Sequence, residues 1–366
     1  MTHRWLLPLI LAFSLPAFAA PPPIADSGSA SDDAAAGSGV DRAAQPEPVV
    51  ENEADDLPPG ARILDTIVVS GVQPGPGMWK VSRDGRVLWV LGTLSPLPNR
   101  MEWNSLEVER RIAAAGVLLM PPRVTMTAEG AGLGGLFLVP SLMKARNNPE
   151  GELLEDVLPA ADYARWQRLK AMYLGRDRGV EKRRPFLAAM ELRDKAFDRA
   201  GLSWRDVVGR AVRRAAKRAD VPVEQPAVSL VIEDARAAVK EFRQSGIDDL
   251  ACFRTTLDQV ENDLDTLALR ANAWAIGDLA TLEALPYADN AKACTDALLG
   301  TGLARSRGFS DLPARVEAAW LAAAEKALAT HAESVAVLPM ARVVGERGYL
   351  RALAAKGYAV EAPAPE

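Results

Sequence analysis

The stretch Val87-Leu88-Trp89-Val90-Leu91-Gly92-Thr93-Leu94-Ser95-Pro96-Leu97-Pro98 decides the fold that we expect for this chain. Its first five residues are apolar and include two β-branched side chains, a pattern that indicates a buried strand. The Arg83-Asp84-Gly85 turn just before it predicts a hairpin, because Asp-Gly suits the tight turns between antiparallel strands. We therefore expect strands at residues 79–82 and 86–91.

A helix and a short strand are expected after this hairpin. Residues 104–115 have Asn104 as a cap, Glu107 at the third helical position and Gly116 as a stop, which is the pattern of a capped helix. Residues 117–120 read Val-Leu-Leu-Met before two prolines, and predict a short buried strand. A strand–helix–strand unit of this kind begins an α/β sheet.

The C-terminal end of the chain repeats this order. The pattern predicts a strand at residues 334–338, a helix at 346–355 and a final strand at 358–361. We expect the two units to share one sheet, so that the loops after Leu91 and Leu338 meet at the carboxyl ends of their strands. Open α/β sheets bind ligands at such ends.

The region between the two units is mainly helical. Apolar residues recur at helical spacing, with Pro, Ser and Gly near the segment ends. We expect helices at 159–174, 185–200 and 313–330, a basic helix capped by Ser203, a strand at 221–223, and a long helical stretch at 229–277. The predicted class is thus α/β, with a central mixed sheet built from the N- and C-terminal strand–helix–strand units and a large helical middle or cap region.

Three segments of the chain resemble the TraB/GumN family. They are residues 79–98, residues 339–361 and the segment Ala271-Asn272-Ala273-Trp274-Ala275-Ile276-Gly277-Asp278-Leu279. The family, whose Tiki-like relatives are metal-dependent proteases, reads Gly-x-x-His after its first strand and Gly-x-x-His again near its end. The resemblance spans most of residues 76–361, and it implies the family fold and peptide-bond cleavage with a bound metal.

This chain departs from the family at the residues that would bind the metal. The two histidine places hold Ser95 and Arg342, the second glycine place holds Pro339, and Met120 stands where the family has an acidic residue. An arginine that the family has at the start of the helix before its last strand corresponds to Arg315. The resemblance therefore points to six family-equivalent cleft positions: Gly92, Thr93, Ser95, Met120, Arg315 and Arg342.

These replacements are unsuited to metal chemistry. A metal ion that activates water needs about three protein ligands, usually His, Asp or Glu, and an open position, whereas Arg342 is a permanent cation. Ser95 would need a base to act as a nucleophile. The two histidines of the chain are His3 and His331, and we expect no pair between Ser95 and His331. We predict no catalytic residue, no metal and no cofactor.

The first sixty residues are expected to lie outside the folded domain. Residues 1–19 have a basic start, an apolar core, and Ala17 and Ala19 before a cleavage site, which is the layout of a secretory signal removed after Ala19. Residues 20–60 are rich in Pro, Ala and Asp and predict a disordered tether. Residues 61–366 would then form a single TraB/GumN-like α/β domain, periplasmic or secreted, with no transmembrane segment.

Composition and charge limit the partners of the chain. A content of 49% hydrophobic and 25% charged residues is ordinary for a globular protein, and the net charge of −5 argues against nucleic acid. Two cysteines in an exported protein, Cys252 and Cys294, predict one disulfide between two helices. Six cations on the basic helix are interpreted as a solvated face: Arg205, Arg210, Arg213, Arg214, Lys217 and Arg218.

Three functional hypotheses stay open at this point. The first is an exported pseudoenzyme that binds a peptide, a glycan or a small anionic ligand in the degenerate cleft, with Arg342 and Arg315 favouring an anionic group. The second is an active periplasmic hydrolase, protease-like, that uses substitute residues. The third is an assembly factor for envelope or exopolysaccharide machinery. Acidic side chains gathered in the cleft would favour the second hypothesis, and a large exposed apolar patch the third.

Overall fold

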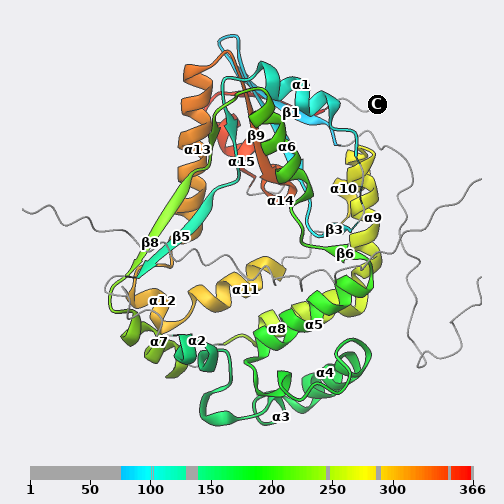
Figure 1. Cartoon of the computed structure of the whole chain (residues 1–366), viewed down its shortest axis with the longest axis vertical. Coiled ribbons are helices and arrows are strands. Elements are labelled where there is room, and N and C mark those ends of the chain that lie inside the picture. Colours follow the sequence, from blue (N-terminus) through cyan, green and yellow to red (C-terminus); the bar gives the residue numbers. More distant parts are fainter. Residues whose placement is uncertain are drawn as a thin grey trace, which may run out of the picture. The chain divides into compact units, whose positions relative to one another are not determined.

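The structure is a computed structural model (Figure 1), which describes residues 76–99, 101, 103–128, 139–244, 248–285, 290–344 and 348–363. The expected secretory signal at residues 1–19 and the expected tether at 20–60 lie outside the described residues, so both stay predictions. The boundaries of the expected single domain at residues 61–366 also stay a prediction.

The centre of the fold is a six-stranded sheet with the order β10-β1-β2-β9-β4-β7. Strands β1 and β10 pair antiparallel to each other, as do β1 and β2, whereas β2, β9, β4 and β7 are parallel neighbours. The mixed sheet built from the two ends of the chain is thereby confirmed. Its strands are β1 Met78–Arg83, β2 Arg86–Thr93, β4 Leu118–Leu119, β7 Val223–Glu224, β9 Glu333–Pro339 and β10 Ala359–Glu361.

The predicted hairpin forms strands β1 and β2. Met78 pairs with Leu91 and Arg83 with Arg86, so that Asp84 and Gly85 form a two-residue turn. Both turn residues have positive φ angles, 52° and 75°, which is what the favoured hairpin turns require and what Asp-Gly supplies at low cost.

One apolar cluster surrounds the central sheet. The strands contribute side chains with no measurable exposure, such as Val81, Leu88 and Val335, and helices pack around them (Figure 1). Each of these helices places an apolar stripe against the sheet cluster, which is the usual way an amphipathic helix is held in a domain. They include α1 Leu106–Ala114, α6 Val207–Arg218, α9 Leu264–Ala275, α10 Leu279–Ala284, α13 Leu312–Thr330, α14 Met340–Val343 and α15 Tyr349–Ala355.

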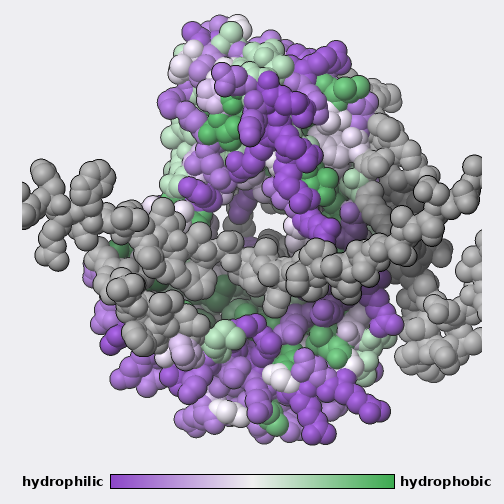
Figure 2. Space-filling model, in the orientation of Figure 1, coloured by the Kyte–Doolittle hydropathy of each residue, from purple (hydrophilic) through white to green (hydrophobic). Residues whose placement is uncertain are grey.

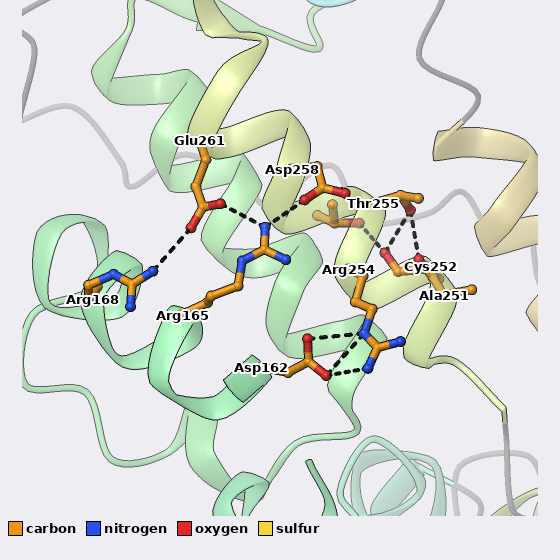
Figure 3. Close-up of polar contacts among 10 residues, drawn as sticks. Asp162, Arg165, Arg168, Ala251, Cys252, Arg254, Thr255, Asp258 and Glu261 are labelled. Carbon is orange, nitrogen blue, oxygen red and sulfur yellow. Dashed lines mark hydrogen bonds and ion pairs between the residues drawn. The ribbon is translucent and has the colours of Figure 1, made fainter. Parts of the chain in front are cut away.

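A second apolar cluster holds the helical middle together. It is centred on Trp166, Phe253 and Leu257, which lie on α4 Ala160–Tyr173 and α8 Leu250–Asn262, with α5 Pro185–Arg199 beside them. Ion pairs reinforce the contact between α4 and α8 (Figure 3). Arg165 bridges Asp258 and Glu261 at 2.6 and 2.7 Å, and Asp162 accepts three bonds from Arg254.

The expected long helical stretch from residue 229 is wrong at its start. Residues Ala227–Ile232 form strand β8, which pairs in parallel with β5 Arg123–Ala128 as a separate two-stranded sheet (Figure 1). The side chains of β8 alternate between exposed and buried, and this is strand periodicity. Helices follow only from α7 Ala235–Gln244 onward.

Three predicted helix starts also need correction. Helix α1 has Ser105 at its N-cap position with no capping bond from its side chain, while the Asn104 side chain accepts a bond from the Leu106 N–H at 3.1 Å. The basic helix α6 is capped by Asp206, whose carboxylate accepts from the Gly209 N–H at 2.8 Å. Ser203 instead lies in strand β6 and pairs with β3. Helix α15 begins at Tyr349 after an extended Gly348, later than residue 346.

The remaining elements are short or complete the helical middle. The predicted helices at 159–174, 185–200 and 313–330 are confirmed as α4, α5 and α13, to within one residue of their expected ends. The others are β3 Leu97–Pro98, α2 Val139–Ala145, η3 Pro149–Gly151, α3 Leu154–Val157, η4 Val180–Lys182, β6 Leu202–Ser203, α11 Asn290–Leu299 and α12 Gly302–Ser306.

Candidate functional site at the end of the central strands

The ends of β2 and β9 lie side by side, although they come from opposite ends of the chain. The parallel register pairs Gly92 with Leu338 and Thr93 with Pro339. The Thr93 hydroxyl also donates to the Leu338 carbonyl oxygen at 3.2 Å. The expected meeting of these two segments at one edge of the sheet is therefore confirmed.

Gly92 is fixed by close packing at this edge. A Cβ atom at Gly92 would lie 2.7 Å from Met340 Cε and 3.2 Å from Trp79 Cζ3, so that only glycine fits without a shift. The buried Trp274 indole N–H donates to the Gly92 carbonyl oxygen at 2.9 Å. Three distant segments of the sequence, which contribute Trp79, Trp274 and Met340, therefore meet around Gly92.

Ser95 lies just beyond the end of β2 and is exposed. Val87, near the start of β2, pairs with Glu333 at the start of β9, and His331 lies two residues before Glu333. The six steps from Val87 to Thr93 span about 20 Å at ~3.3 Å per strand residue. Ser95 and His331 thus lie at opposite ends of the sheet, so the prediction that they form no pair is confirmed.

Met120, in the place of the family's acidic residue, is buried in the apolar cluster of the sheet. Only 2% of the residue is exposed. Its backbone N–H donates to the Glu224 carbonyl oxygen at 2.8 Å, which continues the pairing of β4 with β7. Met120 therefore contributes packing at this position and offers no charge.

Arg342 is exposed on α14, directly after β9. Its guanidinium carbon lies 5.6 Å from the centroid of the Tyr349 ring, within reach of a cation–π contact. Tyr349 is 2% exposed and packs on Trp320 with ring centroids 5.3 Å apart. Burial raises the pKa of Tyr349, and the nearby Arg342 opposes that shift. The cation thus rests beside a rigid aromatic pair.

Arg315 makes different contacts, at the start of α13. Its Nη2 donates to the Ser229 carbonyl oxygen at 3.3 Å, and its Nη1 lies 3.8 Å from the Asp311 carboxylate. These contacts tie Arg315 to strand β8 and to its own helix. Of these two arginines, Arg342 is the one that lies directly after a strand of the central sheet.

The comparisons with known proteins agree with this geometry. The model of the TraB/PrgY/gumN family matches residues 77–362, which contain every element of the central sheet. The chain belongs to the TraB/PrgY/gumN family. No curated protein and no solved structure matches it.

The residues of this TraB/PrgY/gumN chain do not fit the metal that the family resemblance implies. Ser95, Met120 and Arg342 supply a hydroxyl, a buried thioether and a cation, and a cation repels a metal ion. Among the described residues, no three His, Cys, Asp or Glu side chains gather where they could hold a metal ion. We derive no catalytic step through a metal here. Whether the six family-equivalent positions form a ligand cleft stays a prediction.

Two predictions away from this edge are confirmed in this family member. Cys252 on α8 and Cys294 on α11 form a disulfide, with their Cα atoms 4.5 Å apart. Helix α6 turns its cations outward, and Figure 2 shows a hydrophilic surface over it. Arg218 there pairs with Glu109 of α1 at 2.7 Å. Within the described part of the chain, no helix combines the length and apolarity needed to cross a membrane.

Trp274 contacts the end of strand β2, and the sequence contained an indication of this contact that did not enter the predicted site. Trp274 lies in the segment Ala271–Leu279 that resembles the family, but its bond to Gly92 was not foreseen. In that segment, Gly277 has a positive φ of 72° and Asp278 caps α10 by accepting from the Thr281 N–H. Gly277 thus follows the end of α9, and Asp278 caps the next helix. An indole N–H in a buried helix was the clue, because such a donor needs an acceptor.

Proposed function

We propose that this TraB/PrgY/gumN-family protein is exported and non-catalytic, and that it binds an anionic group of a peptide or glycan at the end of β2 and β9. The observation that carries the proposal is Arg342. It stands exposed, directly after β9, in a place where the family resemblance implies a metal-binding histidine. A metal-binding position has thus become a cationic one.

The surroundings of Arg342 suit the binding of an anion. Among the described residues, no carboxylate forms an ion pair with it, and its contact is with the Tyr349 ring. A guanidinium presents several N–H donors in a plane and can bind a carboxylate or phosphate with two parallel bonds. The buried Trp320–Tyr349 pair limits the freedom of the side chain, which lowers the entropy cost of binding.

The hydrolase hypothesis has less support from the same edge. In the part of the chain that the structure describes, Ser95 has no histidine near it, since His331 lies at the other end of the sheet, and a serine nucleophile needs a base. No contact in the described part of the structure favours the assembly-factor hypothesis.

Export to the periplasm or outside the cell is supported by two features. The layout of residues 1–19 is that of a secretory signal cleaved after Ala19. The disulfide between Cys252 and Cys294 suits an oxidising compartment, where such bonds persist.

Metal retention tests the loss of catalysis. The purified chain is equilibrated with zinc, manganese and cobalt, loosely held ions are removed, and the metal content is measured. We expect no retention by a sample that unfolds cooperatively. Near-stoichiometric retention that is lost on chelation would overturn the proposal and direct attention to substitute ligands and proteolysis.

A matched pair of variants tests the role of Arg342. One pair of probes is the acidic and the neutral form of a pentapeptide, and the other is oligogalacturonate and a neutral oligosaccharide. Binding is measured by titration calorimetry. Binding of the anionic probe should weaken about 10-fold or more in Arg342→Gln, because charge-assisted hydrogen bonds contribute roughly 1.5–3 kcal/mol. Arg86→Gln makes the same charge change at the opposite end of β2 and should leave binding unchanged. The proposal would be contradicted if Arg342→Gln and Arg86→Gln bound the anionic probe with equal affinity. It would also be contradicted if the unaltered chain bound the neutral probe as tightly as the anionic one.

A further inference from the structure

The outer face of helix α6 carries charge of one sign. The structure describes this helix over its whole length, and all of its exposed residues are Arg or Lys, whereas its buried residues are Val, Gly and Ala. The exposed residues follow one another at helical spacing, so they share one side of the helix. Figure 2 shows the hydrophilic surface that results. We call these five side chains the cationic face: Arg210, Arg213, Arg214, Lys217 and Arg218.

The cationic face keeps most of its charge in the described part of the chain. Arg218 pairs with Glu109 of α1 at 2.7 Å, and Arg213 donates to the uncharged Gln225 side chain at 3.3 Å. The other three cations form no ion pair with a described residue. A concentrated positive charge therefore stands on the surface of a chain whose net charge is −5.

The like charges of this face repel one another in the free chain. Arg210 and Arg214 are four residues apart, as are Arg214 and Arg218, a spacing at which like charges destabilise a helix and opposite charges stabilise it. Helix α1 has the stabilising arrangement, with Glu107 Oε1 2.8 Å from Arg111 Nε. Arg210 also lies in the first turn of α6, where the helix dipole disfavours a cation. An anionic partner would offset this repulsion.

Exposed apolar side chains border the cationic face at both ends. Trp204, just before α6, is 46% exposed, and Val223, shortly after it, is 40% exposed. Leu106 of α1 is 66% exposed and lies one helical turn from Glu109, the partner of Arg218. A soluble polyanion would use the charges alone, whereas a membrane interface accepts cations and apolar side chains together. The combination therefore favours a membrane surface.

Trp204 is held in place by its neighbours. Its indole N–H donates to Asp194 Oδ1 at 3.1 Å. The Arg193 guanidinium carbon lies 4.8 Å from the centroid of the Trp204 ring, and the Phe197 centroid lies 5.5 Å from it. A side chain fixed in this way loses little freedom on binding, and tryptophan is the type of residue enriched at membrane–water interfaces.

We propose that the cationic face of α6 docks on an anionic phospholipid surface, with Trp204 and Leu106 at the level of the headgroups. All but one of its cations are arginines, whose planar guanidinium can bind a phosphate with two parallel bonds. The contact is peripheral, because the apolar side of α6 stays buried in the sheet cluster. This surface is independent of the proposed function at the end of β2 and β9.

Vesicle sedimentation with the full chain tests the proposal. One set of vesicles is phosphatidylcholine alone, and the other is an equal mixture of phosphatidylcholine and phosphatidylglycerol. We expect much stronger binding to the mixed vesicles, and we expect salt to weaken it because salt screens exposed charges. Equal binding to both sets would overturn the proposal. Binding of soluble polyphosphate without binding of mixed vesicles would also overturn it, in favour of a linear polyanion.

A matched pair of double variants locates the contact. Arg210→Gln combined with Arg214→Gln removes two exposed charges and keeps helix-forming side chains. The affinity for mixed vesicles should fall roughly 20-fold, because each cation near an anionic surface contributes about five-fold. Arg236→Gln combined with Lys240→Gln makes the same charge change at the same spacing on α7 and should lower the affinity less than about 3-fold. Both variants keep residues 1–19, so their difference reports the cationic face.

A second matched pair tests the apolar border. Leu106→Gln should weaken binding to mixed vesicles several-fold, because its side chain leaves water at the interface. Leu269→Gln, at a position 51% exposed on α9, should leave binding unchanged. Equal effects of these two variants would contradict a membrane contact. The proposal is also overturned if the Arg210 and Arg214 double variant unfolds cooperatively and keeps the affinity of the unaltered chain.

Discussion

Two buried tryptophans show how much a single polar atom can matter at the scale of the residue. Trp274 and Trp320 both have no measurable exposure. The Trp274 indole N–H donates to the Gly92 carbonyl oxygen at 2.9 Å, whereas the Trp320 indole N–H has no acceptor in the part of the chain that the structure describes. Burial removes water from both indole N–H groups. Trp274 replaces that water with a protein hydrogen bond, whereas Trp320 does not.

We predict that Trp274→Phe destabilises the chain more than Trp320→Phe. Both variants lose similar volume, but Trp274→Phe also leaves the buried Gly92 carbonyl oxygen unpaired, which costs about 1–3 kcal/mol. Trp320→Phe removes an unsatisfied donor, and that change is neutral or favourable. Urea unfolding of both variants gives the comparison. A larger loss for Trp320→Phe would contradict the assigned hydrogen bond.

At the scale of elements, the helices that the sequence predicted well are those with a strong apolar period. Helices α4, α5 and α13 have regular apolar spacing and a proline at the N-terminus. These local features are enough to predict a helix from the sequence. Strands β5 and β8 were missed because each is half exposed and lies outside the apolar runs that indicate a buried strand. Their pairing joins segments far apart in the chain, which no local pattern reports.

The disulfide between α8 and α11 gives a prediction at the same scale. It closes a loop with a sequence separation of 42 residues, which corresponds to about 4 kcal/mol of stabilisation in the chain-entropy model. Cys252→Ala combined with Cys294→Ala should lower the free energy of unfolding by about that amount. The measurement is urea unfolding with and without reductant.

Reductant serves as the control for this double variant. The unaltered chain should lose stability when its disulfide is reduced, whereas the double variant should not respond. If the double variant were as stable as the oxidised chain, the bond would not contribute the stabilisation assigned to it.

At the scale of the whole molecule, the described residues bury most of their apolar side chains in two clusters. The sheet cluster includes Leu88, Val335 and Trp274, and the helical cluster includes Trp166 and Phe253. Helix α8 contributes Phe253, Leu257 and Val260 to the helical cluster and none of the residues of the sheet cluster. A change on α8 therefore acts first on the helical cluster.

We predict that loss of the disulfide loosens the two clusters unequally. In the double cysteine variant, amide hydrogen exchange should accelerate in α4, α5 and α8, because local stability follows local packing. Exchange in β2 and β9 should stay as slow as in the unaltered chain. Equal acceleration in both regions would show that the clusters unfold as one unit.

The sequence by itself determined the family, the class of fold, the Asp84-Gly85 hairpin and the loss of the metal-binding residues. These features follow from residue identity and short-range periodicity, which a chain displays before it folds. Only the tertiary structure decided the rest. It buried Met120, exposed Arg342 beside Tyr349, brought the Arg315 guanidinium to the backbone of β8 and brought Trp274 to Gly92. Burial and contact depend on which distant segments pack together, and long-range packing is not encoded in any single stretch of sequence.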